Sequence, residues 1–177
     1  MTSPPNFDLT AWIRTVPDFP RPGILFRDIT PLLADADAFS ATVSRMSCHV
    51  PGSCSKVVGI ESRGFIFGAA LAETMDLGFV PVRKPGKLPA EVYGIDYDLE
   101  YGSDRLEIHR DALRPGERVV VVDDLLATGG TAAAACTLLR EMARVEVEAL
   151  LVVIELAPLG GRARLAPLPV HALIRYD

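Results

Sequence analysis

The sequence predicts an α/β protein with a parallel β-sheet that is covered by helices on both faces. Three short, largely apolar runs, at residues 56–60, 78–82 and 119–122, support this prediction. Continuous rather than alternating apolar runs are typical of strands buried on both faces. The first and the last run are each followed by a glycine-containing loop and then by a helical pattern. With 177 residues, the chain is expected to form one domain with its own core.

Composition narrows the class of protein. Hydrophobic residues make up 49% and charged residues 23%, as in globular proteins, and the net charge of −5 argues against nucleic acid or an anionic membrane as a general partner. No apolar run approaches the length of a membrane span, and no charged-then-apolar leader opens the sequence. The three cysteines lack C-x-x-C spacing, which favours free thiols in a reducing cytoplasm. We therefore expect a cytoplasmic protein.

The N-terminal part is expected to combine short helices with an extended arm. Residues 7–16 have helical apolar spacing and predict a short amphipathic helix. The prolines at positions 17, 20 and 22 forbid its continuation and favour an extended arm over residues 18–32. Residues 37–48 then predict a helix with one apolar side.

The middle of the chain alternates strands and loops. The strand at 56–60 leads into Glu61-Ser62-Arg63-Gly64 and a helix over residues 65–73, so that a cation lies at the start of a helix. The strand at 78–82 leads into residues 83–89, which hold three cations within five residues. Residues 89–108 alternate aromatic and acidic side chains between glycines and predict an exposed β-ribbon or mobile lid.

The last third contains the central motif and the remaining elements. A turn at 111–117 leads to the strand at 119–122, and a helix beginning at Thr131 follows. Another strand is expected within residues 145–156, a short turn or helix at 160–165, and a last strand at 170–175.

The central motif predicts a site for a ribose phosphate. Asp123 and Asp124 follow the strand, and the loop 128–131 ends at the N-terminus of a helix. Backbone N–H groups and the helix dipole at such a loop favour a phosphate. The two carboxylates would repel a bare phosphate but accept strong hydrogen bonds from sugar hydroxyls. No lysine follows Gly130, as a P-loop requires, and the acids precede the loop, unlike those of dinucleotide-binding folds.

The string Val-Val-Asp-Asp-Leu-Leu-Ala-Thr-Gly-Gly-Thr, residues 121–131, resembles the phosphoribosyl-pyrophosphate (PRPP) signature of the type I phosphoribosyltransferase family, especially of its adenine-specific members. Three further motifs occur in the order of that family: the arm at 18–32, Arg-Lys-x-Gly-Lys-Leu-Pro at 83–89 and Leu-Glu-Tyr-Gly at 99–102. The resemblance covers roughly Leu9 to Tyr176. It implies the type I phosphoribosyltransferase fold, as a single domain of residues 1–177 with a hood at about 1–34 and a lid at about 88–108.

The resemblance also implies the reaction: adenine and PRPP give AMP and pyrophosphate, with Mg²⁺ held mainly by PRPP and water rather than by direct protein ligands. It implies a homodimer and a cis peptide at Glu61–Ser62. The implied catalytic residues are Glu100, as general acid/base, and Asp124. The implied base-binding residues are Leu25, Phe26 and Arg27. The other implied substrate-binding residues are Ser62, Arg63, Gly64, Arg83, Lys84 and Lys87 for the pyrophosphate, Asp123 and Asp124 for the ribose, Ala127, Thr128, Gly129, Gly130 and Thr131 for the 5-phosphate, and Tyr101 in the lid.

Two other classes of protein would also carry the central loop. Another purine or pyrimidine phosphoribosyltransferase would lack the Phe26 arm and the Leu-Glu-Tyr-Gly motif. A PRPP-sensing regulator would keep the loop without catalysis, but such regulators carry an added DNA-binding domain, for which the acidic chain has no spare length.

Overall fold

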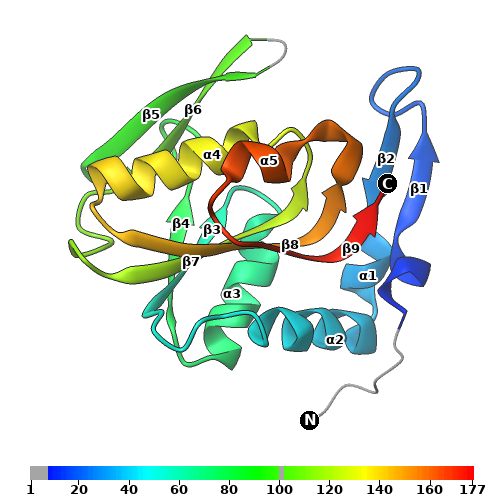
Figure 1. Cartoon of the computed structure of the whole chain (residues 1–177), viewed down its shortest axis with the longest axis horizontal. Helices are drawn as coiled ribbons and strands as arrows, with labels where there is room; N and C mark the ends of the chain where they lie inside the picture. The colour runs from blue at the N-terminus through cyan, green and yellow to red at the C-terminus, as the bar shows by residue number, and fades with distance from the viewer. Residues whose placement is uncertain (1–7, 100–101) are drawn as a thin grey trace. The chain divides into compact units, whose positions relative to one another are not determined.

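The computed structural model describes residues 8–99 and 102–177, and its packing divides the chain into two units, Met1–Arg45 and Met46–Asp177. The second unit is built on a five-stranded sheet (Figure 1). The strand order is β4-β3-β7-β8-β9, and all neighbouring strands are parallel. The sheet therefore agrees with the fold class predicted from the sequence.

The bounds of the sheet strands are β3 Lys56–Ile60, β4 Gly78–Val82, β7 Arg118–Leu126, β8 Glu146–Leu156 and β9 Val170–Tyr176. The helices of this unit are α3 Gly64–Thr74, α4 Gly130–Thr137 with a π-helical continuation Leu138–Met142, η3 Ala157–Leu159 and α5 Gly161–Leu165. Helix α3 lies on one face of the sheet, and α4 and α5 lie on the other (Figure 1).

The core of the second unit lies along β7. All four valines from Val119 to Val122 are 0% exposed, as the apolar run predicts for a strand covered on both faces. The strand does not stop at Val122, however. It continues through both acids to Leu126, because Asp123, Leu125 and Leu126 pair with residues 152–155 of β8. The acid pair thus stands on a strand, where the sequence indicated the start of a loop.

A two-stranded antiparallel hairpin, β5 Val92–Leu99 and β6 Gly102–His109, follows β4. It corresponds to the β-ribbon predicted over residues 89–108. The hairpin is joined to the sheet unit by a backbone bridge in which Arg83 and Glu107 exchange both hydrogen bonds, at 2.9 and 2.8 Å.

The first unit contains η1 Leu9–Trp12, β1 Arg14–Pro17, β2 Leu25–Asp28, α1 Thr30–Ala34 and most of α2 Ala36–Ser47, which ends two residues past the boundary. The amphipathic helix predicted over residues 7–16 is wrong beyond Trp12. The chain from Arg14 to Pro17 instead pairs antiparallel with Leu25–Asp28, and this pairing takes precedence over the local helical spacing. Within the predicted extended arm of residues 18–32, only Leu25–Asp28 forms a strand of this β-ribbon, and the prediction is wrong for residues 30–32, which belong to helix α1.

Candidate functional site

Three loops of the second unit meet at one edge of the sheet. Strand β3 lies between β4 and β7, so the loops that follow these three strands leave from the same, carboxyl-terminal edge. The chain after β3 runs through α3 to β4, on one side of β3. The chain after β7 runs through α4 to β8, on the opposite side. The boundary between β3 and β7 is therefore a topological switch point, where open α/β sheets bind their ligands.

The loop after β7 encloses a small cavity. Its volume is about 110 Å³, and its lining consists of Asp123 and residues 125–132. Gly129 has φ +78°, a left-handed conformation that turns the chain into the first residue of α4. Ala127 to Thr131, the predicted 5-phosphate loop, thus form one wall at a helix N-terminus, as an anion site requires.

The phosphate loop is supported by a residue that the sequence analysis did not single out. A Cβ on Gly161 would lie 2.3 Å from the carbonyl oxygen of Ala127, so only glycine allows α5 to approach this closely. Arg162, the next residue, donates to the buried carboxylate of Glu155 on β8, with Nε 2.9 Å from Oε1, and to the carbonyl of Val170. This pair anchors the start of α5 to the sheet, so Gly161 is held against the loop.

The acid pair lies at the end of β7. Asp124 is 4% exposed, and Asp123 is half-buried with its Oδ1 accepting a hydrogen bond of 2.9 Å from the backbone of Asp124. Burial and the adjacent charge of Asp124 raise the pKa of Asp123 well above its usual value. Burial also raises the pKa of Asp124, an effect that the guanidinium of Arg63 opposes. Ligand groups that donate to these oxygens therefore favour their ionised form.

Arg63 links the acid pair to the loop after β3. Its Nε lies 2.9 Å from Asp124 Oδ2 as an ion pair, although no donor within the described residues is aimed at this oxygen in hydrogen-bond geometry. Gly64, the first residue of α3, packs directly on β7: a Cβ there would lie 2.6 Å from the carbonyl of Val122 and 3.0 Å from Asp123 Oδ1. The expected cis peptide at Glu61–Ser62 is present. Arg63 and Gly64 thus stand beside the acid pair, and Ser62 directly precedes them in the same loop.

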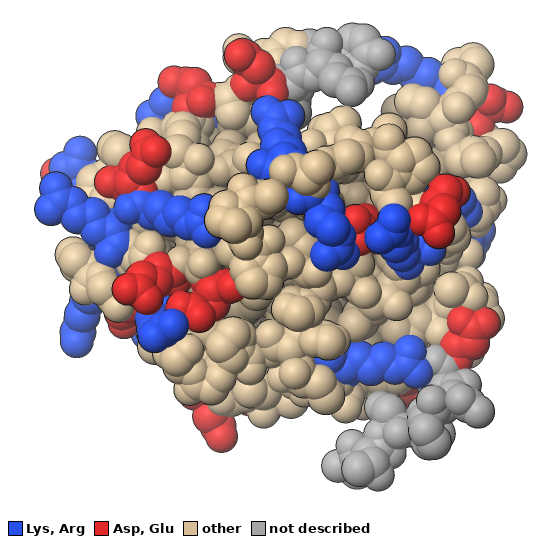
Figure 2. Space-filling model, in the orientation of Figure 1, with Lys and Arg blue, Asp and Glu red and all other residues tan. Residues whose placement is uncertain are grey.

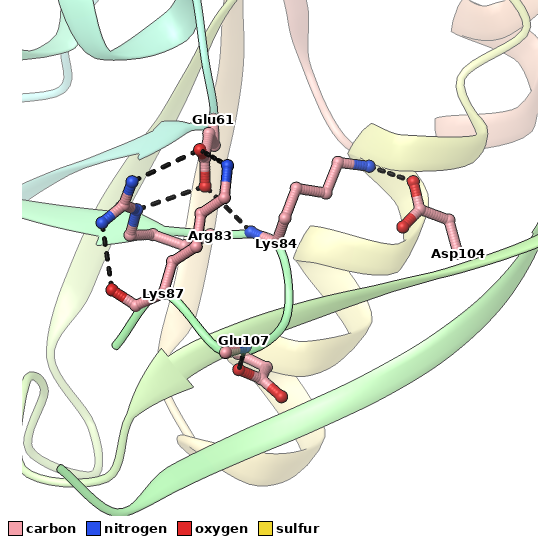
Figure 3. Close-up of polar contacts among 7 residues, drawn as sticks. Glu61, Arg83, Lys84, Lys87, Asp104 and Glu107 are labelled. Atoms are coloured by element: carbon pink, nitrogen blue, oxygen red, sulfur yellow. Dashed lines mark hydrogen bonds and ion pairs between the residues drawn. The ribbon is translucent and has the colours of Figure 1, made fainter. Parts of the chain in front are cut away.

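A third set of groups surrounds Glu61, whose side chain is 8% exposed (Figure 3). Arg83 donates to both carboxylate oxygens, at 3.2 and 3.3 Å, and Lys87 Nζ lies 2.5 Å from Oε1. The backbone N–H of Lys84 donates to Oε2 at 3.0 Å. Burial would raise the pKa of Glu61, but these hydrogen bonds prevail and lower it to about 2. The sequence analysis gave Glu61 no role. In the structure, its carboxylate forms ion pairs with two of the three predicted cations, Arg83 and Lys87.

The remaining predicted residues belong to other segments of the chain. Leu25, Phe26 and Arg27 belong to β2 of the first unit; there Phe26 packs edge-on against Phe19, with ring centroids 5.1 Å apart, and Arg27 donates to Thr15. Glu100 and Tyr101 lie outside the described residues.

The described residues offer no group of three or more His, Cys, Asp or Glu side chains that could hold a metal ion, and none of their helices is long and apolar enough to cross a membrane. On the face shown in Figure 2, acidic and basic side chains are interspersed.

Comparison with known proteins defines the class. A family model described as a phosphoribosyl transferase domain matches residues 28–160, a range that includes all three loops of the sheet edge. The chain therefore belongs to the phosphoribosyltransferase family.

Relatives of the chain include adenine phosphoribosyltransferases. The chain is 57% identical over 170 residues to the enzyme of that name from Chloroflexus aurantiacus, an alignment that covers 96% of this chain and 98% of the relative. The crystal structure of adenine phosphoribosyltransferase from Thermoanaerobacter pseudethanolicus matches with a TM-score of 0.91 at 47% identity, covering 95% and 98% of the two chains. The enzyme from Saccharomyces cerevisiae, solved with an imino-altritol bisphosphate and adenine, gives 0.86 at 40% identity, covering 93% and 96%.

Proposed function

We propose that the protein transfers the 5-phosphoribosyl group of PRPP to adenine, giving AMP and pyrophosphate. One observation carries this proposal: an acid pair, with Asp124 buried and Asp123 half-buried, stands at the end of β7, directly before a loop that encloses a cavity of about 110 Å³ at a helix N-terminus. A diol-binding group beside an anion-binding group matches a ribose 5-phosphate. The names of the relatives supply the base.

The roles of the sheet-edge residues follow from their chemistry. The backbone of Ala127, Thr128, Gly129 and Gly130, with Thr131, binds the 5-phosphate. Asp123 and Asp124 accept hydrogen bonds from the ribose hydroxyls. Asp124 also stabilises the positive charge that develops on the ribose ring in the transition state. The departing pyrophosphate is bound by Ser62, Arg63, Gly64, Arg83, Lys84 and Lys87.

The base and the proton transfer are assigned to other segments. Phe26 stacks on adenine, the backbone at Leu25 hydrogen-bonds the purine edge, and Arg27 lies near the base. Glu100 exchanges a proton with the purine, and Tyr101 belongs to the same substrate-binding segment. Closure of that segment would exclude water, which competes with the base for the anomeric carbon.

Mg²⁺ is the proposed cofactor. The acid pair fits a hydrated cation carried by the substrate, because no described donor is aimed at the buried Asp124 Oδ2, which is therefore able to accept a hydrogen bond from bound water. When bound, the ion would be held mainly by PRPP and water and would neutralise charge on the diphosphate. The proposal also includes a homodimer in the cytoplasm.

The test is pyrophosphate release from PRPP and Mg²⁺ in the presence of adenine, hypoxanthine, guanine, xanthine or uracil in turn. We expect release with adenine. Release with another base but not with adenine would instead establish a different phosphoribosyltransferase. A protein that releases no pyrophosphate with any of the five bases, but shifts a DNA probe only when PRPP is present, would be a regulator.

A further inference from the structure

The β5–β6 hairpin contacts one of the pyrophosphate-binding cations directly. Tyr97 and Asp104 are register partners on the two strands, and cross-strand partners project from the same face of a hairpin. The ammonium of Lys84 forms an ion pair with Asp104 Oδ2 and donates to the Tyr97 hydroxyl at 3.2 Å. In Figure 3, Lys84 extends from the loop after β4 toward Asp104, away from the cluster around Glu61.

The same hairpin reaches the 5-phosphate loop. The Tyr97 hydroxyl oxygen lies 3.2 Å from Asp104 Oδ2 and 3.4 Å from Thr131 Oγ1. A phenol has one proton, and an ionised carboxylate is a stronger acceptor than a hydroxyl. Tyr97 therefore donates to Asp104 and accepts from Lys84 and Thr131. The single hydroxyl proton of Thr131 is thus directed at the hairpin.

Lys84 differs from the other two cations of its loop. Arg83 and Lys87 form ion pairs with Glu61, which directly follows β3 of the central sheet, whereas the carboxylate beside Lys84 belongs to the hairpin. The side chains of Lys84 and Asp104 are 34% and 25% exposed. Burial would lower the pKa of Lys84, but the contacts with Asp104 and Tyr97 raise it, so both partners are charged at neutral pH.

We propose that Asp104, assisted by Tyr97, competes within the chain with the diphosphate of the substrate for Lys84. The inference rests on the proposed function, which assigns Lys84 to the diphosphate. An ammonium has three donors, so Lys84 does not have to release Asp104 in order to bind a phosphate. The carboxylate would then lie beside a polyanion, however, and like-charge repulsion favours their separation. Diphosphate binding therefore weakens the contact between Lys84 and Asp104.

The test compares the affinity of magnesium pyrophosphate for the full-length wild-type chain and two variants by titration calorimetry. Asp104→Asn is expected to bind about two- to fivefold more tightly, the range given by a partly exposed ion pair. Asp98→Asn is the matched control, because it removes one negative charge from an exposed side chain of the same hairpin that has no ion-pair partner within the described part of the chain. We expect its affinity to equal that of the wild type.

A double-mutant cycle assigns the effect to Lys84. Lys84→Ala alone weakens binding, and in that background Asp104→Asn no longer changes the affinity. Unchanged or weaker binding by Asp104→Asn, or an equal gain in Asp98→Asn, would overturn the proposal. In Asp104→Asn the amide oxygen could still accept a hydrogen bond from Lys84. Asp104→Ala lacks this oxygen, and it must also bind magnesium pyrophosphate more tightly than the wild type. If Lys84→Ala binds as tightly as the wild type, the assignment of Lys84 within the proposed function fails, and that result is separate from failure of the Asp104 effect alone.

Discussion

Arg63 Nε lies 2.9 Å from Asp124 Oδ2, so an ion pair joins the loop after β3 to the acid pair of β7. The side chain of Asp124 is 6% exposed, and the side chain of Arg63 is 38% exposed. The buried partner depends on this cation to remain ionised, while the cation also faces solvent, where it is able to meet an incoming anion. The pair therefore sets the charge of the site before substrate binds.

Replacing Asp124 with Asn tests the role of its charge. The isosteric amide keeps the shape of the side chain but cannot stabilise positive charge on the ribose ring. We expect the variant to fold and to lose about 10²–10³ in kcat/KM, the usual effect of removing one transition-state electrostatic contact. The measurement is adenine-dependent pyrophosphate release, with thermal unfolding as the check on the fold. Wild-type kcat/KM in a folded Asp124→Asn variant would contradict the assignment.

The raised pKa of Asp123 predicts proton release on nucleotide binding. Ribose hydroxyls donate to the ionised carboxylate, so AMP binding lowers the pKa of Asp123, and the affinity for AMP falls as the pH drops through the raised pKa of the free protein. Calorimetry at weakly acidic pH, in buffers of different ionisation enthalpy, measures the protons released. Asp123→Asn removes the titrating group and should abolish that release; an unchanged release in this variant would place its source elsewhere.

Glu61 predicts a pH-dependent contribution to stability. Its pKa is lowered from 4.5 to about 2 in the folded chain, so the stabilisation is complete above the unfolded value and is lost as the pH falls toward 2. With partly exposed partners, Glu61→Gln should reduce the free energy of unfolding by about 2 kcal/mol near neutral pH and by much less at about pH 3. Denaturant unfolding at both pH values measures this difference. A deficit that does not depend on pH would show that the ion pairs of Glu61 are not its cause.

Gly161 predicts an effect on phosphate binding from outside the loop. A methyl group at this position meets the Ala127 carbonyl at 2.3 Å, and backbone has to move to accommodate it. We expect Gly161→Ala to raise KM for PRPP by about tenfold or more, because small displacements of a binding group are costly. Gly52→Ala is the control, since nothing lies within 4 Å of the added Cβ. Equal KM values for both variants would refute the supporting role of Gly161.

Much of the sheet could be predicted because its strands are buried and mostly apolar. Residues 56–60 and 78–82 form strands with the predicted bounds, since Val57, Val58, Ile60, Val80 and Val82 are buried and the local apolar pattern suffices. The end of β7 could not be predicted. Its continuation through Asp123 and Asp124 depends on pairing with residues 152–155, and long-range pairing of this kind leaves no local signal. The same reason explains β1, where pairing with β2 replaces a helical pattern.

The candidate site could be predicted where its residues are contiguous in the sequence, but not where its side chains depend on distant partners. The string from Asp123 to Thr131 carries its own chemistry, and all of its residues except Asp124 line one cavity. Glu61 and Asp104 are single acids whose partners lie about twenty residues away, at Arg83 and Lys84. A lone acid in a sequence indicates only a charged residue, so their roles emerged only from the folded chain.

A crystal structure of the protein with AMP tests the central claim most directly. The account predicts that the 5-phosphate lies in the loop of Ala127 to Thr131 and that the ribose hydroxyls donate to Asp123 and Asp124. A nucleotide bound at another place, with this loop and both carboxylates free of ligand, would contradict it.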